Sequence, residues 1–264
     1  MNSIEHGSQK IFISTLGNVS QNNALYNTNI IVSIPPIVIQ QNDPHIPIIG
    51  IESLVLPFSY KMINSQNNKL VINGVLYTIP EGNYNITTLL VVLNDFHVHY
   101  NFSYNSDTNR IAISGSSPDY PYTIDEGTTC ERVLGCKIRA LSYQSGEYFP
   151  SIVNLATNTS VLVQIANLTT KNYDNITGAN NIISKIPVSV QPNQVLNYFN
   201  NQPFFSTITD KVIQMLHIVL LTDDHNPLIL DGNPDWSITI RIDYIKKETS
   251  ILQPTVIQQI RQNN

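Results

Sequence analysis

The clearest structural signal in this chain is the sequence WSITIRIDY at residues 236–244. Apolar and polar side chains alternate along it without a break, as expected for a β-strand that covers a core with one face and meets water with the other. The side chains predicted to share the apolar face are Trp236, Ile238, Ile240, Ile242 and Tyr244. The segment therefore predicts a half-buried strand and leads us to expect a mainly β fold.

Runs of β-branched and other apolar residues recur along the chain, and loops rich in Asn, Asp, Pro and Gly separate them. The other predicted strands are 11–13, 30–34, 46–56, 161–165, 182–190 and 212–221. Prolines border several of these runs, which suits strand ends and sheet edges, and Pro187 predicts an edge position for the strand that contains it. Many strands joined by long polar loops favour a β-sandwich or a jelly roll.

Two segments predict helices instead. Residues 87–96 have a helical apolar face, and Asn85 or Thr87 is placed to cap the first turn. The residues of that face are Leu89, Leu93 and Phe96. Residues 128–131 fit a capping box, and Gly135 is placed to end the short helix that follows.

Short strands are predicted around these helices. Residues 69–78 contain Asn73-Gly74, which favours a type I′ hairpin because both residues tolerate a positive φ. Residues 101–104 and 110–114 predict two further strands. The mixture of strand and helix periodicity predicts a compact α+β unit at residues 66–145.

This unit divides the chain into four predicted parts. Residues 1–65 would hold an N-terminal arm and the first sandwich strands, and residues 66–145 would be an α+β insertion. Residues 146–248 would supply the remaining strands, and residues 249–264 would form a C-terminal tail.

The composition excludes several classes of protein. The chain has 264 residues, a net charge of -5, 12% charged residues, 32 Asn and 37 Ile. Its apolar content argues against intrinsic disorder, and its acidity argues against nucleic-acid binding by bulk charge. No apolar run approaches the roughly 18 residues of a membrane helix. Two cysteines, Cys130 and Cys136, are too few for a disulfide scaffold, and we expect two buried thiols.

Residues with metal-binding chemistry occur without a complete ligand set. His97 and His99 would lie on one strand face, but the sequence offers no third ligand. Asp223, Asp224 and Asp231 carry the oxygen donors that Ca²⁺ prefers. Their spacing is not that of an EF-hand loop, and such residues commonly form turns. We therefore predict no metal site.

Catalytic patterns are equally weak. Asp243 with Glu52 or Glu81 would supply the paired carboxylates of a hydrolase, but nothing in the sequence marks them as buried. Lys246-Lys247 and Arg261 form only a sparse basic end. Phosphate loops, nucleophile elbows and zinc-protease motifs are absent from the sequence. We predict that the protein is not an enzyme and has no catalytic or cofactor-binding residue.

The sequence IPEGNYNI at residues 79–86, followed by Leu89-Leu90 and Leu93-Asn94, resembles penton (minor capsid) proteins of virophages and related Polinton-type DNA viruses. Short patterns across roughly residues 50–245 continue the likeness, which is nearest to mavirus-like virophages. The further segments that carry the likeness are 109–114, 133–135, 221–224 and 230–238.

The resemblance implies a single jelly-roll β-sandwich with an α+β insertion and extended terminal arms. It implies a homopentamer at the five-fold vertices of an icosahedral capsid, with major capsid proteins as neighbours. The length agrees, because 264 residues are too few for two eight-stranded jelly rolls with their loops. We expect location in the virion, assembly in the host cytoplasm, no specific nucleic acid and no membrane span. The insertion would project outward, where it could meet a host surface component.

Two other classes stay open. A glycan- or receptor-binding adhesin of the virion would need clustered exposed aromatic residues, since jelly rolls also serve as lectins. The candidates are Tyr120, Tyr122, Tyr143 and Tyr148, although such crowding is more often core or interface. A cupin-type enzyme would need a metal-binding histidine constellation, and six dispersed histidines do not form one.

Overall fold

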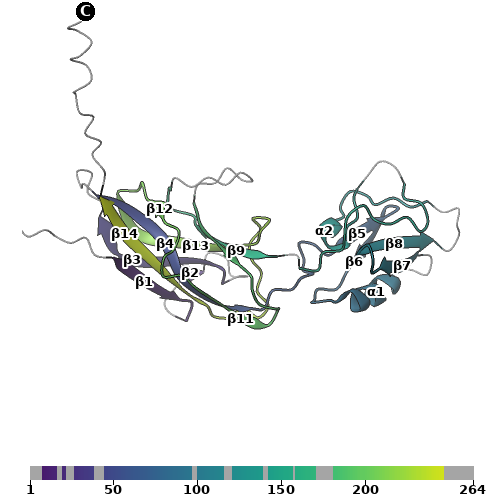
Figure 1. Cartoon of the computed structure of the whole chain (residues 1–264), viewed down its shortest axis with the longest axis horizontal. Coiled ribbons are helices and arrows are strands. Elements are labelled where there is room, and N and C mark those ends of the chain that lie inside the picture. The colour runs from purple at the N-terminus through teal and green to yellow at the C-terminus, as the bar shows by residue number, and fades with distance from the viewer. Residues whose placement is uncertain are drawn as a thin grey trace, which may run out of the picture.

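The structure of the chain, a computed structural model, has two lobes joined side by side (Figure 1). The larger lobe is a β-sandwich, and the smaller lobe carries the two helices found in the described part of the chain. The described residues are 8–16, 20–21, 27–38, 45–96, 100–115, 121–138, 142–156, 158–170 and 181–246. The expected C-terminal tail at residues 249–264 and the first seven residues of the expected N-terminal arm lie outside them.

The larger lobe consists of two antiparallel sheets. Sheet A has the order β1-β14-β4-β11, and β12 also pairs with β4. Its strands are β1 (Gln9–Ser14), β4 (His45–Phe58), β11 (Gln194–Phe199), β12 (Ser206–Thr207) and β14 (Ser237–Lys246). Sheet B has the order β10-β9-β13-β3-β2. Its strands are β2 (Ser20–Gln21), β3 (Asn29–Val38), β9 (Ser160–Ile165), β10 (Ile182–Pro187) and β13 (Val212–Leu221).

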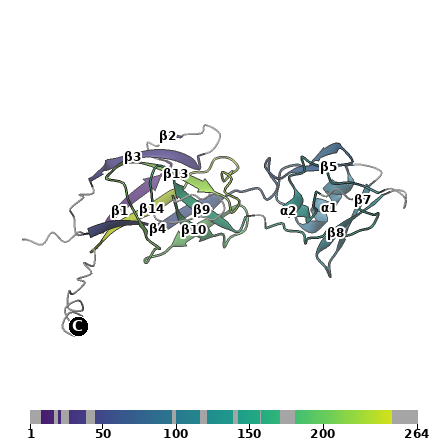
Figure 2. The same cartoon turned by 90° about the horizontal axis from the view of Figure 1, so that it is seen from above.

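The chain moves between these sheets in jelly-roll order. Leaving aside the two-residue strands β2 and β12, it runs β1 in sheet A, β3 in B, β4 in A, β9 and β10 in B, β11 in A, β13 in B and β14 in A. Eight strands in two four-stranded antiparallel sheets with this order define a jelly roll. Figure 2 shows the sandwich with β3 along one side and β4 along the other. The predicted fold class is confirmed.

The opening signal of the sequence is confirmed in β14. Ile238, Ile240 and Ile242 are buried in the sandwich core, and Trp236 is buried beside them. The indole Nε1 of Trp236 donates a hydrogen bond of 3.0 Å to the backbone oxygen of Asn27, so the buried N–H is satisfied. Burial of each of the three isoleucine side chains stabilises the fold by roughly 1.5–3 kcal/mol.

Two strands differ from their predictions. β3 continues through Pro35 and Pro36 to Val38. The register of β3 with β13 shifts between Ser33 and Ile37, so the prolines lie in an irregular stretch where the hydrogen-bonded ladder is already interrupted. β11 was not predicted, because its sequence QVLNYF buries only Leu196 fully.

The smaller lobe is inserted between β4 and β9. It contains the hairpin β5 (Lys69–Ile72) and β6 (Val75–Thr78), the helix α1 (Ile86–Asn94), the hairpin β7 (Tyr100–Asn105) and β8 (Arg110–Gly115), and the short helix α2 (Glu131–Leu134). Asn73 and Gly74 have φ values of 48° and 75°, which confirms the predicted hairpin turn. The lobe has its own hydrophobic core, separate from that of the jelly roll.

The caps of the two helices have different outcomes. Asn85 caps α1 in a capping box with Thr88, as expected. The capping box predicted for α2 is wrong, because its N-cap is Cys130 and no side chain caps it. The hydroxyls of Thr128 and Thr129 instead accept hydrogen bonds from backbone N–H groups of β5, which ties the turn before α2 to that strand.

The buried residues of the second core run from Ile63 to Val153. The core of the inserted lobe therefore draws on chain at both sides of the expected bounds of 66–145. The division of the chain into four parts at residues 65, 145 and 248 stays a prediction.

Gly135 provides a test of this packing, because it has a φ of 78° and approaches the Ser151 backbone closely. A Cβ there would lie 2.2 Å from the Ser151 carbonyl oxygen. We expect Gly135→Ala to lower the free energy of unfolding by about 2 kcal/mol or more, measured by chemical denaturation. Gly74→Ala is the control: its φ is 75° but no atom lies within 4 Å of the added Cβ, so it should cost about 1 kcal/mol. Equal losses in both variants would contradict the close approach.

Candidate functional site

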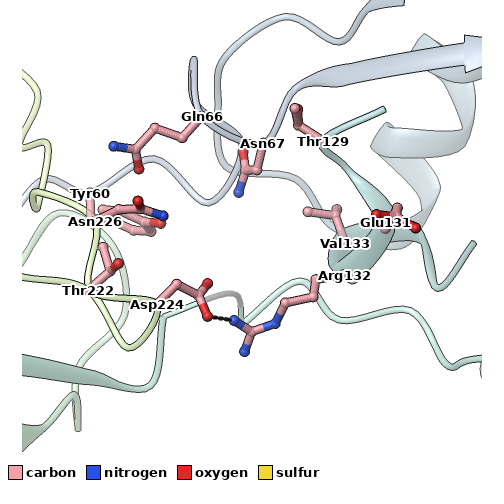
Figure 3. A pocket seen from close by; sticks show the side chains of 10 residues that line it. All are labelled: Tyr60, Gln66, Asn67, Thr129, Glu131, Arg132, Val133, Thr222, Asp224 and Asn226. Atoms are coloured by element: carbon pink, nitrogen blue, oxygen red, sulfur yellow. Dashed lines mark hydrogen bonds and ion pairs between the residues drawn. The ribbon is translucent and has the colours of Figure 1, made fainter. Parts of the chain in front are cut away.

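A cavity lies where the two lobes meet. It has a volume of about 270 Å³ and is lined from both sides. Figure 3 shows Gln66, Tyr60, Asn226 and Thr222 along one side, with Glu131 and Val133 across from them. We call this space the junction cavity. Its lining residues are Tyr60, Gln66, Asn67, Thr129, Glu131, Arg132, Val133, Thr222, Asp224 and Asn226.

An ion pair crosses the junction cavity. The guanidinium of Arg132, on α2, binds the carboxylate of Asp224, in the turn after β13 (Figure 3). About half of each side chain is exposed to solvent. A pair this exposed contributes roughly 0–1 kcal/mol to stability. The pair nevertheless matters for the position of the lobes, because it joins the inserted lobe to a loop of the jelly roll.

Some polar side chains of the lining are used by the protein itself. Asn67 accepts from the backbone N–H of Asn64 at 2.8 Å and donates to the backbone oxygen of Met62 at 2.9 Å. Glu131 accepts from the backbone N–H of Ile138 at 3.0 Å. Both side chains therefore bind backbone groups of the protein and stabilise the walls of the cavity.

Asp223 is the anchor of the turn that carries Asp224. Its carboxylate accepts hydrogen bonds from Thr159 and Ser160, where the chain enters β9, and lies 3.5 Å from the Nζ of Lys185. Burial opposes the charged form, but the hydrogen bonds from Ser160 and Thr159, together with the charge of Lys185, outweigh it and lower the pKa of Asp223 to about 2.

The three aspartates considered for Ca²⁺ are therefore engaged separately. Asp223 binds the start of β9, Asp224 binds Arg132, and Asp231 lies 3.1 Å from the Nζ of Lys61. Among the residues that the structure describes, no three His, Cys, Asp or Glu side chains gather as a metal site. His97 and His99 lie outside the described residues.

The candidate carboxylate pair is not brought together. Asp243 pairs with Arg241 at 2.8 Å, Glu81 lies 3.7 Å from the Nζ of Lys61, and Glu52 pairs with Lys10 at 2.7 Å. Glu52 is buried, which the sequence did not indicate. It sits at a register shift between β4 and β14, a bulge that no alternation pattern reveals.

The tyrosines considered for glycan binding do not form one exposed cluster within the described residues. Tyr122 and Tyr143 stack at 5.4 Å in the second core, whereas Tyr148 is exposed. Tyr120, Lys247 and Arg261 lie outside the described residues. Sequence reasoning missed the junction cavity, because its walls come from segments far apart in the chain.

Both cysteines are buried free thiols, as predicted. A hydrogen bond with Cys136, together with burial, raises the pKa of Cys130 well above its usual value. None of the helices within the described ranges has the length and apolar character needed to cross a bilayer.

The anchor role of Asp223 predicts a specific dependence on pH. A carboxylate whose pKa is lowered on folding stabilises the protein above its unfolded pKa near 3.8, and this stabilisation is lost as the pH falls toward 2. We expect Asp223→Asn to lower the melting temperature at pH 7 and to flatten its fall between pH 4 and pH 2, followed by circular dichroism. Asp107→Asn is the control, since that carboxylate makes no hydrogen bond within the described chain. An unchanged acid profile in Asp223→Asn would refute the anchor.

Comparisons with known proteins give structural likenesses only. No family model and no curated protein matches the chain. The mavirus penton protein is similar in structure at 10% sequence identity and a TM-score of 0.45, over 90% of this chain and 100% of that one. A chain from the 3.5 Å cryo-EM structure of the Sputnik virophage is similar at 11% identity and a TM-score of 0.40, over 90% of this chain and 98% of that one.

Proposed function

We propose that the chain is a structural virion protein that forms a homopentamer at the five-fold vertices of an icosahedral capsid, as a penton. Its neighbours would be major capsid proteins, its location the virion, and its place of assembly the host cytoplasm. The role is mechanical and not enzymatic. The sequence resemblance at residues 79–86 and the single jelly roll with one large insertion support this proposal.

The observation that carries it is a set of exposed apolar side chains on the outer face of sheet A. Phe12 and Phe199 are 76% and 72% exposed, and Val55 and Val195 accompany them. Phe204, which is 86% exposed, lies in the loop between β11 and β12, where its backbone passes beside Gly50 of β4. We call these five residues the sheet-A patch. Clusters of large apolar side chains left open to water mark surfaces that bind other proteins.

The sheet-A patch extends across the whole sheet. Phe12 is opposite Thr239, Thr239 is opposite Ser53, and Ser53 is opposite Phe199. Three strand spacings therefore separate the two rings, roughly 14 Å. Between them, the hydroxyls of Ser53 and Thr239 form a hydrogen bond of 2.8 Å. This central row carries no charge, so covering it leaves no ion desolvated without a partner.

A ring of five copies requires two different surfaces on each subunit. The second surface we assign is the sheet-B patch, which consists of Val38, Val212 and Met215 at one end of β3 and β13. All three are exposed, and Val38 is opposite Val212 in the sheet. The two patches lie on the outer faces of opposite sheets, which suits head-to-tail contact between neighbouring copies.

The inserted lobe would then project from the ring. It joins the jelly roll at one end of the sandwich, away from the end where β14 finishes (Figure 1). In this position it would meet a host surface component, while the two patches serve assembly.

The assembly role predicts a change of mass in one variant. Replacing Phe12 and Phe199 together by Ser removes the apolar side chains from the sheet-A patch without touching the core. We expect the wild type to have the mass of five chains in light scattering, and the double variant to have the mass of one. Truncating buried aromatic anchors of an interface commonly costs more than 2 kcal/mol each, enough to dissociate a ring at micromolar concentration.

The matched control is Val91→Ser with Val75→Ser, two exposed apolar residues of the inserted lobe. This control should keep the pentamer mass. A wild type that stays monomeric at high concentration, or equal dissociation of both double variants, would overturn the assignment.

A further inference from the structure

The junction cavity contains polar groups that the protein leaves unused. The side-chain amides of Gln66 and Asn226 make no hydrogen bond with any described residue. The same is true of the hydroxyls of Thr222 and Tyr60, within the part of the chain that the structure describes. All four side chains line the cavity, and Figure 3 shows them on one side of it. Gln66 is half-buried and Asn226 is exposed, so water can hydrogen-bond to their amides, and a ligand that enters the cavity can take the place of that water.

The charges of the lining decide which partner is suitable. The lining contains two carboxylates, those of Glu131 and Asp224, and one cation, Arg132. Asp224 already binds Arg132. An anion would meet a surplus of negative charge, and a second cation would compete with Arg132 for Asp224. A neutral ligand avoids both costs.

The shape and chemistry of the site point to a hydroxyl-rich ligand. Each amide offers a donor and an acceptor side by side, which matches the two adjacent hydroxyls of a sugar ring. Tyr60 supplies an aromatic wall, held by stacking on Phe58 at a ring distance of 5.8 Å. A volume of about 270 Å³ is just below the range for drug-sized ligands, so the cavity suits a single ring.

We propose that the junction cavity binds one neutral sugar unit of a glycan, with Gln66 and Asn226 as its principal hydrogen-bonding groups. The site rests on the proposed contact of the inserted lobe with a host surface, and it does not require the pentamer. Where five copies assemble, five such sites on one ring would strengthen weak binding by avidity. The exposed Arg132–Asp224 pair at the cavity joins its two walls.

Saturation-transfer difference NMR on the purified full chain tests this site. The probes are glucose, galactose, mannose and N-acetylglucosamine, with anionic N-acetylneuraminic acid for comparison. We expect transfer to at least one neutral sugar and a weaker signal from the anionic one. The double variant Gln66→Ala with Asn226→Ala should weaken binding tenfold or more, because it removes both principal hydrogen-bonding side chains of the site.

The matched control is Asn101→Ala with Gln144→Ala, which removes two exposed amides of the inserted lobe outside the cavity. It should bind as the wild type does, and equal melting temperatures of the two double variants would establish that both are folded. Absence of transfer to every neutral sugar, a strongest signal from the anionic sugar, or equal binding by both double variants would overturn the site. The mass of each sample is measured in parallel, so a pentamer that binds no sugar overturns only this site and a monomer that binds sugar overturns only the assembly role.

Discussion

The pairing of β14 with β4 forms the middle of sheet A and joins the C-terminal strand of the jelly roll to the strand that leads into the inserted lobe. β14 lies between β1 and β4, and its contact with β4 runs from Ser237 to Lys246. One face of β14 closes the sandwich core, and the other face carries Thr239 in the uncharged row between Phe12 and Phe199 and the Arg241–Asp243 ion pair further along. The same alternation that buries the isoleucines therefore also creates the uncharged floor of the sheet-A patch.

The far end of β4 determines where the second lobe sits. The chain leaves β4 at Phe58 and returns into β9 at Ser160, so two segments of chain connect the inserted lobe to the jelly roll. The turn after β13 contacts both the returning chain, through Asp223, and the inserted lobe, through Asp224. The junction cavity is the space enclosed by these contacts, and its position follows from the topology of the jelly roll.

Much of this fold was predictable from the sequence, because its signals are local. The alternation of β14, the Asn73-Gly74 turn and the cap of α1 each depend on residues within a few positions of one another. Thr128 misled the prediction for α2 because its hydroxyl binds a strand 57 residues earlier in the chain. The burial of Glu52 and the junction cavity depend on register and on distant segments, which a local pattern does not contain.

Low charge density has a structural explanation in this arrangement. The sandwich presents neutral hydroxyl and amide groups and exposed rings where it would meet its neighbours, and its few charges are mostly paired within the subunit, as with Lys10 and Glu52. We propose that five copies abut through opposite faces of the jelly roll. A cryo-EM reconstruction of icosahedral particles containing this chain tests it most directly. We expect five copies around each five-fold axis, with the sheet-A patch of one copy against the sheet-B patch of the next. Density for the chain away from the vertices, or a ring in which both patches face solvent, would contradict it.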